Sequence, residues 1–139
     1  MKKSKYTYLK DGFEGILYDT ESEDDRLLIV IQGLKGLELP EKYAGLFAKK
    51  GYSVLAMTYY GAPGLPDTMR AIPLEMFQTA VDHMKEYGSG KYRRFGIYGN
   101  SKGAGMALLA ASVVPDISLV IAASTFGHIM QGSGKADLD

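Results

Sequence analysis

The chain has 139 residues, its 16 basic side chains balance its 16 acidic ones, and it contains no cysteine. This length suits one domain, residues 1–139, since a domain of this size buries roughly 68–70% of the surface of its unfolded chain. Balanced charge gives no overall field for nucleic acid, and no apolar run reaches the ~20 residues of a membrane span. The lack of cysteine excludes disulfides and a cysteine nucleophile. With 2 histidines in the chain, neither a metal nor a cofactor is expected. A cytoplasmic location is expected.

The N-terminal part predicts an antiparallel hairpin followed by a buried strand. Residues 6–9 and 13–18 are expected to be strands, joined by a favourable turn that contains Gly12. Residues 27–31 form a continuous apolar run. Such a run is typical of a strand that is covered on both faces in a parallel sheet.

The middle of the chain predicts two helices and a strand. Residues 40–50 are expected to be a helix that Gly51 ends, with an apolar face of Tyr43, Leu46 and Phe47. Residues 53–59 predict a second buried strand. Pro73 begins the next helix and Gly88 ends it. The core face of that helix follows helical spacing through Leu74, Phe77, Val81 and Met84.

The last predicted elements complete a repeating pattern of strands and helices. Residues 94–98 predict a strand, residues 104–114 a buried helix that Pro115 ends, and residues 119–124 one more buried strand. This alternation predicts an α/β fold of three layers, with a mostly parallel sheet and the N-terminal antiparallel hairpin. We expect the fold to be incomplete at the C-terminus.

Three loops are expected at the carboxyl ends of the strands, where the cleft of such a sheet lies: residues 32–36, 59–64 and 99–103. The last of them reads Gly-Asn-Ser-Lys-Gly between a strand and a helix. This is the G-x-S-x-G pattern of the nucleophile elbow in α/β-hydrolases, and it predicts Ser101 as a nucleophile. Gly99 and Gly103 lack a Cβ, so strand and helix can approach closely beneath the serine. The alternative is a glycine-rich turn in which Ser101 only caps a helix.

A serine nucleophile needs backbone N–H groups that stabilise the developing oxyanion. In an elbow of this kind one N–H comes from the residue after the nucleophile, here Lys102. The second is expected from Leu34, which follows Gly33 in the loop after an earlier strand. The alternative is that residues 32–36 form an ordinary turn.

A general base is harder to find in the sequence. His83 falls within the predicted helix that Pro73 begins and is expected to be a surface residue. His128 follows the last predicted strand. In this fold, however, an acid and then a histidine follow the serine, so His128 comes too early in the chain. Asp137 and Asp139 lie in a polar tail and are expected to be solvated.

Several segments resemble the C-terminal hydrolase domain shared by acyl-CoA thioesterases and bile acid-CoA:amino acid N-acyltransferases. The elbow carries that family's lysine after the nucleophile, at Lys102. Residues 56–60 read Ala-Met-Thr-Tyr-Tyr, residues 65–66 read Leu-Pro, and residues 73–77 read Pro-Leu-Glu-Met-Phe. The family has similar segments in the same order, so the resemblance covers roughly residues 27–124.

The resemblance implies that Ser101 attacks an acyl-CoA thioester and that water releases the acyl group. The transferase branch has cysteine at this position, so hydrolysis is expected rather than transfer to an amine. The expected partner is an acyl-CoA substrate, and neither nucleic acid nor a membrane is expected to bind. Whether the chain forms a homo-oligomer is left open. Two alternatives remain: a dienelactone-hydrolase-like carboxylesterase or peptidase, and a catalytically incomplete fragment. The family's acid and histidine lie beyond the last residue, so the 139-residue chain is expected to be inactive alone.

Overall fold

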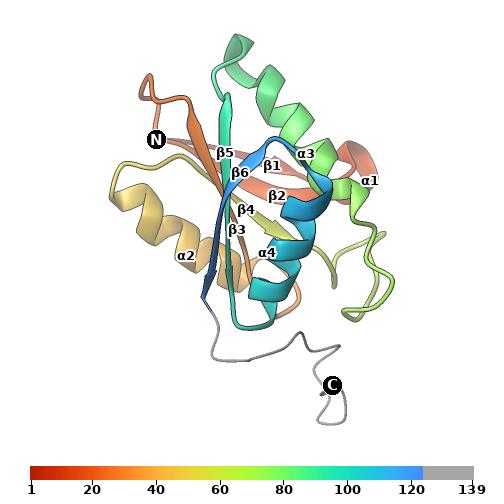
Figure 1. Ribbon diagram of the computed structural model, residues 1–139. Helices are drawn as coiled ribbons and strands as arrows, with labels where there is room; N and C mark the ends of the chain where they lie inside the picture. Colours follow the sequence, from red (N-terminus) through yellow and green to blue (C-terminus); the bar gives the residue numbers. More distant parts are fainter. Residues whose placement is uncertain (124–139) are drawn as a thin grey trace.

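The computed structural model describes residues 1–123, which form a mixed sheet with helices on both faces (Figure 1). The strands are β1 (Lys2–Tyr6), β2 (Glu14–Asp19), β3 (Arg26–Ile31), β4 (Val54–Thr58), β5 (Arg94–Asn100) and β6 (Ile117–Ala123). The helices are α1 (Tyr8–Asp11), α2 (Glu38–Lys49), α3 (Glu75–Glu86) and α4 (Lys102–Val113), with a 3-10 turn, η1 (Tyr87–Ser89).

The sheet has the strand order β1-β2-β4-β3-β5-β6. β4, β3, β5 and β6 are parallel neighbours, whereas β2 pairs antiparallel with both β1 and β4. The α/β fold, the mostly parallel sheet and the antiparallel N-terminal hairpin predicted from the sequence are therefore confirmed.

The hairpin differs in detail from the prediction. β1 ends at Tyr6, and residues 8–11 form a helical turn instead of continuing the predicted strand. The Asp11 carboxylate accepts a hydrogen bond of 2.8 Å from the Thr7 N–H, which stabilises this turn over an extended chain. Gly12 ends the turn with φ of 85°, a conformation that glycine adopts without steric cost.

Helix α2 covers one face of the sheet, and α3 and α4 cover the other (Figure 1). α2 begins at Glu38 and buries Pro40 and Ala44. The small Ala44 faces the sheet, and Leu46 follows two residues later. Two residues rotate a helix by about 200°, so Leu46 points away from the sheet and is 59% exposed. The prediction of Leu46 on the core face was therefore wrong.

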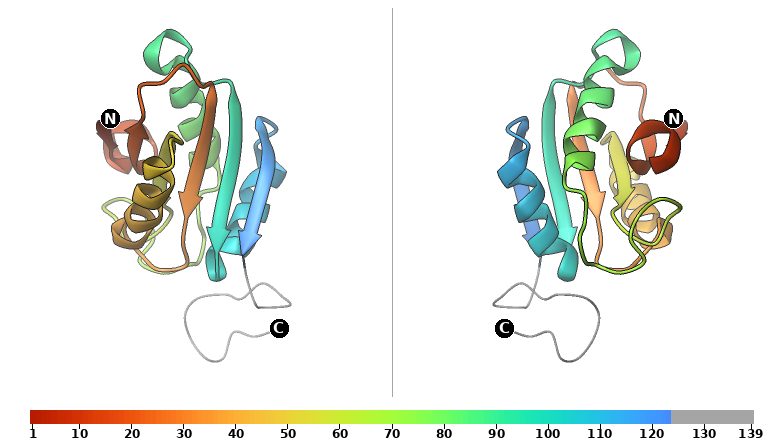
Figure 2. Two further views of the ribbon diagram at one scale, coloured as in Figure 1. Left: turned by 90° about the vertical axis from the view of Figure 1, so that its left-hand side faces the viewer. Right: turned by 90° about the vertical axis from the view of Figure 1, so that its right-hand side faces the viewer.

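The helix after the elbow and the last strand are less covered than predicted. Ala104, Ala107 and Ala110 of α4 face the sheet, but Leu108 is 52% exposed. Strand β6 is an edge strand whose Leu119 is 55% exposed. In the left view of Figure 2, α2 covers only part of its face, and β3, β5 and β6 lie open beside it. The prediction that residues 104–114 and 119–123 are fully buried is therefore wrong. Ser124, the last residue of the predicted strand, lies outside the described residues.

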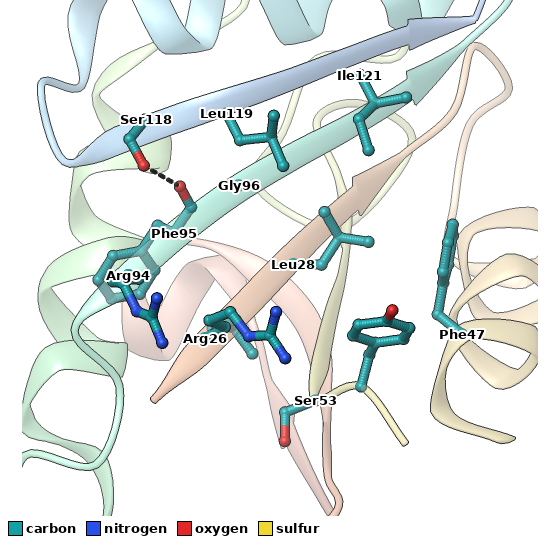
Figure 3. A pocket seen from close by; sticks show the side chains of 12 residues that line it. Arg26, Leu28, Phe47, Ser53, Arg94, Phe95, Gly96, Ser118, Leu119 and Ile121 are labelled. Atoms are coloured by element: carbon teal, nitrogen blue, oxygen red, sulfur yellow. Dashed lines mark hydrogen bonds between the residues drawn. The ribbon is translucent and has the colours of Figure 1, made fainter. Parts of the chain in front are cut away.

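A hollow of about 450 Å³ occupies this open face beside α2. Leu28, Phe47, Leu119 and Ile121 form apolar walls, and Arg26 and Arg94 lie at one end (Figure 3). None of the residues that line the hollow belongs to the elbow at residues 99–103. The hollow is therefore separate from the candidate active site.

A buried carboxylate anchors the segment that leads into β5, the strand before the elbow. Asp19 is 6% exposed and forms an ion pair with Lys91. It also accepts hydrogen bonds from the hydroxyls of Tyr87 at 3.0 Å and Tyr92 at 3.1 Å. Burial opposes the ionisation of Asp19, but these donors and the Glu21 N–H outweigh it and hold its pKa below the usual value.

We predict that Asp19→Asn lowers the free energy of unfolding by about 3 kcal/mol at pH 7, because Lys91 loses its buried partner. The depressed pKa means that Asp19 stabilises the fold above its unfolded pKa of about 4. This contribution disappears as the pH falls through the lower folded pKa. Urea unfolding at pH 7 and near pH 2 measures it, and the difference between wild type and variant should shrink in acid.

Asp24→Asn is the matched control for Asp19→Asn. Its partner Arg26 lowers the pKa of Asp24 to about 2, but the pair lies at the surface, where such pairs contribute less than about 1 kcal/mol. Equal losses of stability in the two variants would contradict the assignment of Asp19 as a buried anchor.

Candidate active site

Ser101 occupies the sharp connection between β5 and α4 (Figure 1). Its backbone has φ of 57° and ψ of −125°. A non-glycine residue with positive φ costs of order 1–3 kcal/mol and persists only where the surrounding structure enforces it. The Ser101 side chain is exposed and makes no capping hydrogen bond to α4. Helix capping therefore does not explain why a serine stands here.

The two glycines of the motif allow backbone contacts that no other residue would permit. A Cβ on Gly99 would lie 2.1 Å from the carbonyl oxygen of Gly103. A Cβ on Gly103 would lie 3.0 Å from the backbone of Gln32. Strand β5, helix α4 and the loop after β3 are thus packed backbone to backbone. The Ser101 N–H also donates to the Ala123 carbonyl of β6 at 2.9 Å, which fixes the elbow to the sheet.

The loop of residues 32–36 lies directly against the first residue of α4. A Cβ on Gly33 would lie 2.7 Å from the Lys102 Cβ and 3.3 Å from the Lys102 backbone nitrogen. Leu34 follows at once, and its side chain is 61% exposed. Within residues 1–123, the Leu34 N–H has no hydrogen-bond partner. The structure thus brings together two segments, the elbow that carries Ser101 and Lys102 and the loop that carries Leu34.

This arrangement suits the stabilisation of a negative charge beside Ser101. Lys102 is the first residue of α4, and the N-terminus of a helix carries a partial positive charge from its aligned peptide dipoles. The Leu34 N–H lies on the neighbouring loop. Two backbone donors on adjacent segments can stabilise an oxyanion that forms between them.

Within residues 1–123, no hydrogen bond joins a histidine to Ser101. His83 is half-buried on α3. Its ring packs edge-on against Phe13 and Tyr6, with distances between ring centroids of 5.3 Å and 6.1 Å. The expectation of a surface histidine was therefore only partly right. His128, Asp137 and Asp139 lie outside the described residues.

The sequence places Gln32 and Tyr60 in loops at the cleft but indicates no role for either side chain. Gln32 is 2% exposed, and its side-chain Nε2 has no hydrogen-bond partner within residues 1–123. Tyr60 is 5% exposed, and its hydroxyl donates to the carbonyl of Gly33 at 2.7 Å. The sequence placed residues 59–64 at the cleft, but it gave no signal for a hydrogen bond to the loop after β3.

Among residues 1–123, no three histidine, aspartate or glutamate side chains gather in a way that could hold a metal ion. Every helix in this part of the structure is also too short or too polar to cross a membrane.

Comparison with known proteins gives clear relatives. No protein-family model matches the chain. It is 35% identical over 83 residues to acyl-coenzyme A thioesterase 1 of Rattus norvegicus, a match that covers 60% of this chain and 20% of that protein. Acyl-coenzyme A thioesterase 1 of Homo sapiens is 36% identical over 83 residues, with the same coverage of 60% and 20%. The chain is related to the acyl-CoA thioesterases. The expected resemblance to this family is confirmed, and the match spans about a fifth of the length of these relatives.

Solved structures confirm the α/β-hydrolase fold. An esterase of Pyrococcus furiosus has a TM-score of 0.64 and 21% identity, covering 86% of this chain and 52% of that one. A dienelactone hydrolase-like promiscuous phosphotriesterase from metagenomic libraries has a TM-score of 0.63 and 16% identity, covering 93% and 59%. At this identity the likeness concerns the fold alone. The thioesterase relatives include mitochondrial forms, so the cytoplasmic location remains a prediction.

Proposed function

We propose that the protein is a serine hydrolase of acyl-CoA thioesters, with Ser101 as its nucleophile. The observation that carries the proposal is the enforced backbone of Ser101, with φ of 57°, between two glycines in backbone contact. The relatedness to acyl-CoA thioesterases supports the thioester as substrate. The backbone geometry thus supports the nucleophile, and the relatedness supports the substrate.

The proposed reaction has two steps. The Ser101 hydroxyl attacks the thioester carbonyl, the carbon–sulfur bond breaks, and CoA leaves as the thiol after taking a proton. Water then attacks the acyl-enzyme ester and releases the fatty acid and the free serine. In both steps the carbonyl oxygen becomes an oxyanion, which the backbone N–H groups of Lys102 and Leu34 would stabilise. Both steps also need a base that takes a proton from serine or water, and we propose that it lies outside residues 1–123.

The second candidate is an esterase that acts on oxygen esters. The same fold occurs in an esterase and in a dienelactone hydrolase-like enzyme, and the fold alone does not choose between the two leaving groups. The same nucleophile and oxyanion donors would serve both reactions, since the acyl-enzyme is identical. The two candidates differ only in the leaving group, which is a thiol in one and an alcohol in the other.

We predict that the protein expressed from its complete open reading frame turns over acyl-CoAs faster than p-nitrophenyl esters of the same chain length. A kcat/KM at least about 10-fold higher for the thioester would reflect about 1.4 kcal/mol of preferential transition-state binding of the CoA portion. A panel of matched acyl chains measures this ratio. A higher kcat/KM for the oxygen esters would move the assignment to the esterase.

A further inference from the structure

Tyr60 follows β4 by two residues and reaches across to the loop after β3. Its side chain is buried, and its hydroxyl donates to the Gly33 carbonyl at 2.7 Å. Burial raises the pKa of Tyr60, so the hydroxyl keeps its proton and remains a donor at neutral pH. The acceptor belongs to the peptide group between Gly33 and Leu34.

This peptide group also carries the N–H of Leu34, the expected oxyanion donor. In a trans peptide the carbonyl and the N–H point in opposite directions in one plane, and the described chain contains no cis peptide bond. The hydrogen bond from Tyr60 therefore fixes the direction of the Leu34 N–H. That N–H has no partner of its own in residues 1–123, so nothing on its own side restrains it.

Tyr60 holds the loop at a second point through its backbone. The Tyr60 carbonyl accepts hydrogen bonds from the Gly36 N–H at 3.3 Å and from the Thr58 hydroxyl at 3.0 Å. The next residue, Gly61, packs so closely that a Cβ on it would lie 2.4 Å from the Lys35 Cβ. The loop of residues 33–36 is thus tied to Tyr60 at both ends, and its other side rests on Lys102.

We propose that Tyr60 is a positioning residue for the oxyanion site, because it aims the Leu34 N–H through the Gly33 carbonyl. The inference rests on the proposed function, since it matters only if Ser101 forms an oxyanion. An N–H stabilises the transition state most when it is aimed before charge develops, because it then needs no reorganisation during the reaction. Without the hydroxyl, the Gly33 carbonyl loses the hydrogen bond that holds it, and the peptide group between Gly33 and Leu34 is less restrained. A donor that must be ordered during the reaction contributes less than one that is already in place.

The test compares Tyr60→Phe with Tyr59→Phe in protein from the complete open reading frame. Tyr59 is the matched control, because it is 1% exposed and its hydroxyl has no partner within residues 1–123. Both variants lose one buried hydroxyl from neighbouring rings whose centroids are 5.5 Å apart. Steady-state hydrolysis of an acyl-CoA and the rate of fluorophosphonate labelling are measured for each, well below its melting temperature.

We expect Tyr60→Phe to lower kcat by roughly 10- to 100-fold, less than the 10²–10³-fold cost of removing an oxyanion donor outright. KM should stay within about 2-fold, because the bound thioester in its ground state carries no oxyanion. Tyr59→Phe should change neither quantity. A purely structural role of Tyr60 would lower the melting temperature and leave kcat of the folded enzyme unchanged.

Other outcomes separate a failure of this inference from a failure of the proposed function. If wild type is active and the two variants behave alike, or if Tyr60→Phe raises KM at constant kcat, Tyr60 does not aim the donor, while the proposed function stands. If wild type neither reacts with the probe nor hydrolyses an acyl-CoA, the proposed function itself fails. Should Tyr60→Phe not fold, Thr58→Val removes the bond to the Tyr60 carbonyl and should lower kcat a few-fold. An unchanged kcat there also counts against the proposal.

Discussion

Replacing Ser101 by alanine is expected to abolish labelling by a fluorophosphonate probe and to lower acyl-CoA hydrolysis by about 10³–10⁴-fold or more. The change removes only the hydroxyl oxygen that forms the acyl-enzyme. It should leave the fold intact, because that hydroxyl makes no capping hydrogen bond to α4. The measurement uses protein from the complete open reading frame, with labelling read by intact mass and turnover by release of CoA.

Ser112→Ala provides the matched control on the same helix. Ser112 is exposed, and its hydroxyl donates to the Leu109 carbonyl within its own helix, so its removal should change neither labelling nor turnover. Labelling that survives in Ser101→Ala would show that another residue is the nucleophile. Loss of both activities in Ser112→Ala would mean instead that α4 is sensitive to any change, and Ser101 would lose its special status.

The strand–turn–helix geometry at Ser101 was predictable because the residues that the turn requires lie close together in the sequence. The motif needs a serine at positive φ with a glycine two residues before it and another two residues after it, and all three residues stand in one short segment. The strand before the motif and the helix after it also follow local patterns. The sequence therefore indicated both the fold and the position of the candidate nucleophile, and the described structure has the predicted strand–turn–helix geometry at Ser101.

The features that the sequence did not indicate depend on contacts between distant segments. Tyr60 and Gly33 are 27 residues apart, and no local pattern shows that a hydroxyl at one reaches the carbonyl of the other. Leu46 is one of the apolar residues of the predicted helix face. In the structure, however, α2 turns the small Ala44 toward the sheet and leaves Leu46 exposed. The exposure of Leu119 depends on its place on the part of the sheet face that α2 leaves open, which an apolar run alone does not reveal.

Gly99→Ala is expected to cost about 3 kcal/mol or more of the free energy of unfolding. The new Cβ would lie 2.1 Å from the Gly103 carbonyl oxygen and 2.9 Å from the Ala107 Cβ. The nearest atom belongs to the backbone of α4, so no side-chain rotation can relieve the clash. The helix must move away from β5, and the elbow that holds Ser101 must move with it. Urea unfolding measures the loss, and soluble yield reports it where the variant does not fold.

Gly45→Ala is the control that separates this clash from the general effect of adding a methyl group. Gly45 lies inside α2, and a Cβ there would meet nothing within 4 Å. Alanine should therefore stabilise the protein by roughly 0.5–1 kcal/mol, because it loses less conformational freedom than glycine when a helix forms. Opposite signs for the two substitutions are the expected result. If Gly99→Ala proved as stable as wild type, β5 and α4 would not be in backbone contact, and the strained Ser101 would lose the packing that enforces it.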